Sequence, residues 1–255
     1  MKKLLFLILA TLLFGFEVSV TILPQKGVVE AIAKDKVKVN VMVPPGSSPA
    51  TYSPSFKELK AIRNSKVYFT IGVPFDKKYL AKIKSINPSI KIISFAKYIK
   101  TSKNPHIWLS PALLMLQAKV VLDTLIDLDA KNRDFYLANY ENYIKKLSLL
   151  EVKGFREIKQ KAFITFHPSF YYFAKDFHLK EIAIQKEGKA PSFKYLSEII
   201  SLAKKEGVRV VIISPEFPKK YALLVAKKIR AKVVEISPLN ENIFYTLKKL
   251  IEALK

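Results

Sequence analysis

The segment AFITFHPSF, residues 162–170, joins a short apolar, β-branched run directly to a histidine, His167. Similar runs recur along the chain and alternate with amphipathic stretches, a pattern that predicts βα units in a parallel sheet. In an open parallel sheet, ligands bind beyond the carboxyl ends of the strands, because loops and helix N-termini converge there. The segment therefore predicts an α/β fold and the edge of the sheet at which functional residues should lie.

Working outward from this segment, the predicted strands form two sets of four. They cover residues 18–23, 37–43, 67–71 and 90–95, then 162–166, 180–184, 208–214 and 231–237. The region between the two sets has no strand signal, and its latter part places five apolar or aromatic residues on one helical face: Tyr136, Tyr140, Tyr143, Leu147 and Leu150. We therefore expect two α/β lobes, residues 18–110 and 159–255, each with a roughly four-stranded parallel sheet flanked by helices and joined by a long helical region, 111–158.

The N-terminal residues, MKKLLFLILATLLFGF, predict export. Two lysines precede an uncharged, mostly apolar run from Leu4 to Phe16, which is too short to span a bilayer and is typical of a secretory signal peptide. We assign residues 1–17 to this signal; an uncleaved membrane anchor is the alternative, because no clear small-x-small cleavage site follows. The chain has no cysteine, which excludes a lipid-modified cysteine, a disulfide and a thiolate metal site. We expect a periplasmic or otherwise extracytoplasmic protein that is not a lipoprotein.

The chain is strongly basic. It has 44 Lys and Arg residues against 21 Asp and Glu, a formal net charge of +23. An excess of this size suggests nucleic acid or an anionic membrane surface as a partner. The lysines are scattered through every predicted helix, however, and no RNA-binding or helix-turn-helix signature is present. Together with the export signal, this argues against nucleic acid and favours solvated helix faces near an anionic membrane.

Three candidate metal ligands follow predicted strands. His106, in NPHIWLSP, comes after the strand at 90–95, His167 follows 162–166, and Glu216, in PEFP, follows 208–214. Two imidazoles and one carboxylate are an acceptable donor set for zinc or manganese, with water in any remaining position. By spacing alone, a lone histidine is more often a structural residue than a ligand, and Glu216 could instead pair with a neighbouring lysine.

Other aromatic and imidazole groups are predicted to be structural. The third histidine, His178, ends a predicted helix, so we expect it to be a surface or capping residue. Trp108 and the adjacent Tyr171 and Tyr172 are expected to be wall or core residues rather than a platform for stacking sugars.

At these residues the chain resembles the metal-binding solute-binding proteins of bacterial ABC importers for zinc and manganese. VMVPPGSSPATYSPS resembles that family's VPPGxDPHTYEPS loop, NPHIWLSP its DPHxWLDP, and ITFHPSFYYFAKDFHLK its xTxHxAFxYFAxxYGLK. KAPSFKYLSEIISLAKKEGVRVVIISPEF and AKVVEISPLN resemble two further motifs, in the family's order. The resemblance implies two lobes joined by a rigid backbone helix, with one metal bound between them for delivery to a membrane permease by a monomer.

Carried over by position, the resemblance implies that His106 and His167 are metal ligands. Ala50 stands where the family has its first histidine, Ser237 where an aspartate often supplies the fourth ligand, and Ala190 replaces the acid of the EPS motif. We therefore expect a reduced site of His106, His167 and Glu216 for zinc, or alternatively manganese, completed by solvent or a hydroxyl.

Three functions remain open at this stage. The first is a carrier that captures a divalent metal ion and delivers it to an ABC permease. The second is a family member with a degenerate site that binds another ligand or acts as a non-metal scaffold. The third, a metal-dependent hydrolase, needs an additional acid or base, and the sequence has no HExxH motif, nucleophile elbow or glycine-rich phosphate loop.

Overall fold

The computed structural model describes residues 15–100, 104–185 and 190–255. It contains two parallel four-stranded sheets, as predicted. The first has the order β2 (Val37–Val41), β1 (Phe16–Val20), β3 (Ser65–Thr70), β4 (Lys91–Ser94). The second has the order β6 (Lys180–Ala183), β5 (Ala162–Thr165), β7 (Val210–Ile213), β8 (Lys232–Glu235). The two lobes therefore repeat one topology.

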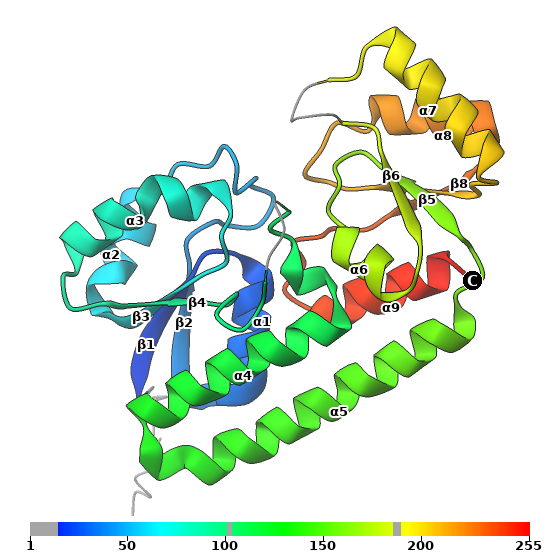
Figure 1. Ribbon diagram of the computed structural model, residues 1–255. Coiled ribbons are helices and arrows are strands. Elements are labelled where there is room, and N and C mark those ends of the chain that lie inside the picture. The colour runs from blue at the N-terminus through cyan, green and yellow to red at the C-terminus, as the bar shows by residue number, and fades with distance from the viewer. Residues whose placement is uncertain (1–14, 101–103, 186–189) are drawn as a thin grey trace, which may run out of the picture.

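Helices pack against both sheets (Figure 1). In the first lobe, α1 (Leu23–Ala33) lies on one side of the sheet, and α2 (Phe56–Asn64) and α3 (Pro74–Ile86) lie on the other. The second lobe contains α6 (Tyr171–Asp176), α7 (Phe193–Lys205), α8 (Lys220–Ile229) and α9 (Ile243–Ala253). At the start of α7 the Ser192 hydroxyl accepts a hydrogen bond from the Tyr195 N–H, and Gly207 follows the end of the helix with φ +63°.

The predicted helical connection consists of two helices. α4 (Pro111–Leu128) turns at the 3₁₀ helix η3 (Ala130–Asn132) into α5 (Arg133–Glu157), which runs beneath both lobes in Figure 1. At a rise of about 1.5 Å per residue, the 25 residues of α5 extend roughly 37 Å. Tyr136, Tyr143 and Leu147 are buried on its inner face, as the periodicity predicts. This helix is the long connection expected between the lobes.

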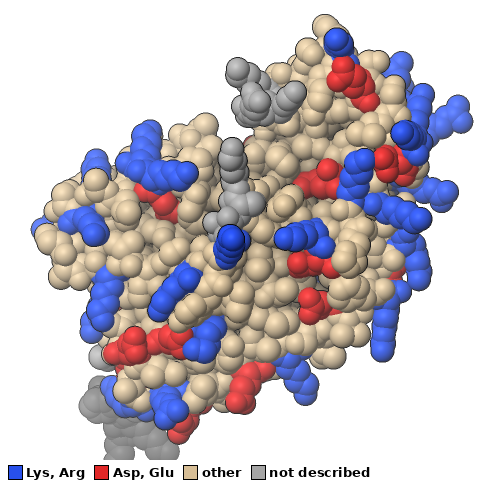
Figure 2. All heavy atoms as spheres, in the orientation of Figure 1, with Lys and Arg blue, Asp and Glu red and all other residues tan. Residues whose placement is uncertain are grey.

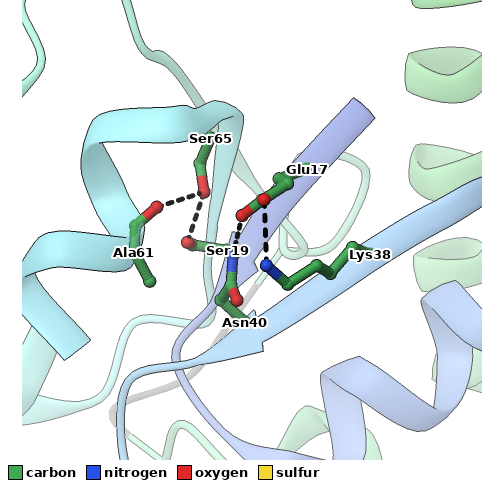
Figure 3. A network of polar contacts seen from close by, with 6 residues as sticks. All are labelled: Glu17, Ser19, Lys38, Asn40, Ala61 and Ser65. Carbon is green, nitrogen blue, oxygen red and sulfur yellow. Dashed lines mark hydrogen bonds and ion pairs between the residues drawn. The ribbon is translucent and has the colours of Figure 1, made fainter. Parts of the chain in front are cut away.

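The first strand begins at Phe16, two residues before the predicted one. Between β1 and β2, Glu17 accepts hydrogen bonds from Lys38 and Asn40, both at 2.9 Å, and between β1 and β3 the Ser19 and Ser65 hydroxyls lie 2.7 Å apart (Figure 3). The apolar export run therefore continues into a sheet strand, which is why periodicity alone placed the boundary too late. Residues 1–14 of the predicted signal lie outside the described residues.

One hydrophobic core extends through both lobes. Side chains from the first sheet, from α4 and α5, and from α9 belong to a single buried cluster that also includes Phe163 and Val210 of the second sheet. The outer face of the second sheet forms a separate cluster beneath α7 and α8, which includes Ile164, Leu196 and Val225. The lobes are thus joined by packed side chains as well as by the chain itself.

Within the described ranges, no helix is long and apolar enough to cross a membrane.

Candidate metal centre

A cavity of about 710 Å³ lies between the lobes, at the carboxyl ends of both sheets. The first lobe contributes residues 48–51 after β2 and 73–74 after β3. The region after β4 contributes Asn104, Pro105, His106 and Trp108, and the second lobe contributes residues 167–169, Gln185, Glu216, Phe217, Pro238 and Leu239. Loops following seven of the eight strands thus meet here, as the rule for parallel sheets predicts.

His106 lies immediately before the 3₁₀ helix η2 (Ile107–Leu109). Its Nδ1 lies 2.6 Å from Oδ1 of Asn104, which also accepts the His106 backbone N–H at 2.9 Å. An amide oxygen can only accept, so Nδ1 carries the proton and Nε2 keeps its lone pair. Burial, aided by the neighbouring His167, lowers the pKa of His106 to about 3. The imidazole is therefore neutral, the form that binds a metal.

His167 has a matching arrangement in the other lobe. Its Nδ1 lies 2.6 Å from Oε1 of Gln185, and its ring stacks on Phe217 with 4.7 Å between ring centres. Burial lowers the pKa of His167, while the hydrogen bond to Gln185 opposes that shift. Its Nε2 lone pair is free for the same reason as in His106.

The structure brings these two histidines together. Their ring centres lie 5.1 Å apart. Asn104 links the two segments, because its Nδ2 donates to the carbonyl of Pro168 at 2.8 Å while its Oδ1 holds His106. Below them, Nε1 of Trp108 donates to the carbonyl of Pro238 at 2.7 Å. Two histidines 61 positions apart in the sequence are thus held as one pair.

Glu216 lies in the wall of the same cavity but does not join the pair. Its Oε1 accepts a hydrogen bond from the Ser237 hydroxyl, and its Oε2 is buried without a hydrogen-bond partner among the described residues. No group of three His, Cys, Asp or Glu side chains in the described part of the chain is arranged to hold one metal ion. Of the three predicted ligands, the structure therefore brings together only His106 and His167.

The remaining predicted residues occupy the following places. Ala50 lines the cavity, on the first-lobe side. Trp108 and Tyr172 are buried, whereas Tyr171 is 42 % exposed. His178 is exposed just after α6, where its φ of +55° ends the helix, so the expected surface or capping role is consistent with its position.

Asn104 and Gln185 were not recognised from the sequence. Gln185 follows β6, and the carboxyl-end rule applied to that strand would have pointed to it. Asn104 stands two residues before His106, in a loop whose conformation no periodic pattern predicts.

Comparison with known proteins agrees with this two-lobed structure. The model of the ZnuA family, described as zinc-uptake complex component A, periplasmic, matches residues 18–254. The chain belongs to the ZnuA family. ZnuA proteins are metal-binding solute-binding proteins of ABC importers, so the chain is a transport protein and not an enzyme. The hydrolase alternative is thereby set aside.

Individual ZnuA relatives resemble the chain over most of its length. It is 26 % identical to the high-affinity zinc uptake system protein ZnuA of Bacillus subtilis (strain 168), over 86 % of this chain and 77 % of the relative. A crystal structure of ZnuA superposes with a TM-score of 0.88 at 34 % identity, covering 93 % of this chain and 96 % of the other. A zinc-bound ZnuA deletion mutant gives a TM-score of 0.86, also at 34 % identity, covering 93 % and 95 %.

Proposed function

We propose that this protein captures one divalent metal ion, zinc in preference to manganese, between its lobes and delivers it to an ABC permease. The observation that carries the proposal is the His106–His167 pair. Each Nδ1 is held by an amide oxygen, which leaves both Nε2 atoms as ligands. Two imidazoles that share a tetrahedral ion at about 2.0–2.1 Å have ring centres roughly 5 Å apart, close to the spacing here.

Zinc is the better match for these donors. Imidazole nitrogen suits zinc, whereas manganese prefers carboxylate, carbonyl and water oxygens. Glu216 is proposed as the third ligand, because its Oε2 has no hydrogen-bond partner among the described residues and a side-chain rotation would exchange the bond to Ser237 for the metal. Solvent completes the coordination. With Ala50 and Ser237 in family ligand positions, we expect weaker binding than a four-ligand site gives.

Export and assembly belong to the same proposal. The protein acts outside the cytoplasm as a monomer, after a signal peptide is removed. We place the cleavage before Phe16, two residues earlier than the boundary after residue 17 assigned from the sequence, because Phe16 is buried in β1 and Glu17 accepts a hydrogen bond from Lys38 of β2. Mass spectrometry of the mature N-terminus checks this position, and a chain that begins after Glu17 would contradict it.

The test is zinc and manganese titration of the metal-free protein by calorimetry, with variants His106→Ala, His167→Ala and Glu216→Gln. We expect one equivalent of zinc, a loss of at least 100-fold, about 2.7 kcal/mol, for either histidine variant, and a smaller loss for Glu216→Gln. His178→Ala is the matched control, because this histidine is exposed outside the cavity.

A second function is favoured by one specific observation. Ser237 holds the Glu216 carboxylate away from the imidazole pair, so the described side chains do not form a three-ligand site. If neither metal binds at micromolar concentration, or if binding survives both histidine substitutions, the fold serves another ligand or a scaffold role instead.

A further inference from the structure

A second cavity lies between α1, α5 and α9 and shares no lining residue with the metal centre. Its volume is about 610 Å³. α1 and α9 each pack against α5 and belong to the shared core, and α5 and α9 run close together in Figure 1. We call this cavity the α5 groove, and its lining residues are Ala31, Lys34, Asn139, Asn142, Tyr143, Lys146, Leu149, Leu150, Lys153, Asn242, Phe244 and Lys248.

The α5 groove is lined by four lysines and by no acidic residue. Two of these lysines have a loosely paired carboxylate. The Nζ of Lys153 lies 3.9 Å from Oε2 of Glu157, and the Nζ of Lys248 lies 4.0 Å from Oε1 of Glu252. Lys34 and Lys146 have no carboxylate within 4.0 Å among the described residues. Two ammonium groups without a carboxylate partner, beside two that are only loosely paired, favour an anion in the groove.

Neutral groups of the groove also suit an anion. Tyr143 is 4 % exposed, and its hydroxyl has no hydrogen-bond partner in the described part of the chain. The amide of Asn142 lies one residue before it in the same lining. A buried hydroxyl without a partner is unusual in a folded protein, because its donor goes unused. An oxyanion in the groove would accept from this hydroxyl and from the lysines.

An apolar edge accompanies these donors. Leu149 lines the groove and is 62 % exposed, and Val152, three residues further along α5, is 46 % exposed. Lysines beside exposed aliphatic groups are typical of surfaces that meet lipid headgroups, where cations bind phosphate and apolar side chains enter the boundary of the acyl chains. A free anion would have no apolar group to contact these exposed aliphatic side chains.

We propose that the α5 groove binds the phosphate of an anionic membrane lipid and so holds the protein at the membrane surface. This binding would give a specific role to part of the +23 net charge, whereas other lysines and arginines are scattered over the face drawn in Figure 2. It also gives a chain without cysteine a means of attachment that needs no lipid modification. The inference does not depend on metal binding.

The experiment is co-flotation of the mature protein with vesicles of phosphatidylcholine alone or mixed with phosphatidylglycerol. The groove variant is Lys34→Gln with Lys146→Gln. The matched control is Lys227→Gln with Lys228→Gln, two exposed lysines on α8 that lose the same charge far from the groove. Tyr143→Phe removes the hydroxyl without changing charge. Circular dichroism and zinc titration of each variant verify that the fold and the metal centre are intact.

We expect binding to the phosphatidylglycerol vesicles only, with at least a fivefold loss in the groove variant, less than a twofold loss in the control pair and an intermediate loss in Tyr143→Phe. Glycerol phosphate should compete. Equal losses in the two lysine variants would overturn the proposal, because binding would then follow total charge alone. Groove-dependent binding of glycerol phosphate without vesicle binding would overturn the lipid source and show a site for a free phosphate ester.

Discussion

At the residue scale, the chemistry of the metal centre is set by two amides as much as by two histidines. Asn104 and Gln185 each accept from an Nδ1–H, so both imidazoles present Nε2. Neither amide would bind a metal strongly itself. Their contribution is to orient the two rings and to select the tautomer. Without these hydrogen bonds, neither the ring orientation nor the tautomer would be fixed.

The pH dependence of metal binding follows from the two histidines. An ordinary imidazole gains its proton as pH drops through about 6 to 7, so histidine ligands with unshifted pKa values would lose zinc over that range. Burial lowers the pKa of His106 to about 3 and lowers that of His167 as well. The neutral, ligating form therefore persists to lower pH, and zinc affinity should stay nearly constant from about pH 7.5 to 6.5 and fall only in more acidic solution. Calorimetric titration at several pH values checks this.

The same shifts affect the stability of the metal-free protein. Because both folded-state pKa values are lowered, the unfolded chain binds more protons below the ordinary histidine pKa of 6.5. The free energy of unfolding should therefore decrease as pH falls below about 6.5. His106→Gln should reduce this slope, and an unchanged slope in that variant would contradict the assigned pKa of His106.

Ala50 offers a gain-of-function prediction. It lines the same cavity as the histidine pair, and the motif resemblance places it where the family has its first histidine. Ala50→His should add a third imidazole and tighten zinc binding at least tenfold, about 1.4 kcal/mol. Ala50→Leu, similar in bulk but without a donor atom, is the control. Equal affinities for the two variants would show that this loop does not face the metal.

At the element scale, α5 depends on one close contact. A Cβ at Gly154 would lie 2.3 Å from the ring of Phe177, so only glycine allows this part of α5 to approach the end of α6. Phe177 in turn packs edge-to-face on Phe155, with 5.1 Å between ring centres. Glycine has a low helical propensity, and the packing contact with Phe177 offsets that cost.

Gly154→Ala should therefore destabilise the protein. Alanine favours the helix by about 1 kcal/mol over glycine, whereas forcing the Phe177 ring aside costs roughly 1–3 kcal/mol. We expect a net loss of up to about 2 kcal/mol in chemical denaturation. Lys145→Ala, at an exposed position of the same helix, should change stability little. An increase in stability for Gly154→Ala would show that the ring moves freely.

At the scale of the whole molecule, the lobes are joined by a continuous core. Buried residues from the first sheet, from α4 and α5, and from the inner face of the second sheet form one cluster. Elements that share a core tend to unfold together, because exposing one half exposes the apolar surface of the other.

A scanning calorimetry experiment should accordingly show one main unfolding transition for both lobes. Zinc should move that transition to higher temperature, since a ligand that binds only the folded state stabilises it. Two well-separated transitions, with only one of them sensitive to zinc, would show that the lobes are energetically independent.

By itself, the sequence determined the architecture and singled out two histidines as candidate metal ligands. Eight β-branched runs, one helical region and the residues after each strand predicted two parallel sheets, a long connecting helix and a site at their carboxyl edge. These features could be predicted because periodicity and the parallel-sheet rule depend on local residue order. The motifs around His106 and His167 pointed to the family that the comparisons show.

Only the tertiary structure decided how the site is assembled. Asn104 and Gln185 come from different lobes, and their hydrogen bonds to the histidines depend on how loops pack across the cleft. The bond from Ser237 to Glu216, which engages the expected third ligand, likewise joins residues that follow different strands. Such contacts are set by side-chain packing between distant segments, and no local pattern in the sequence encodes them.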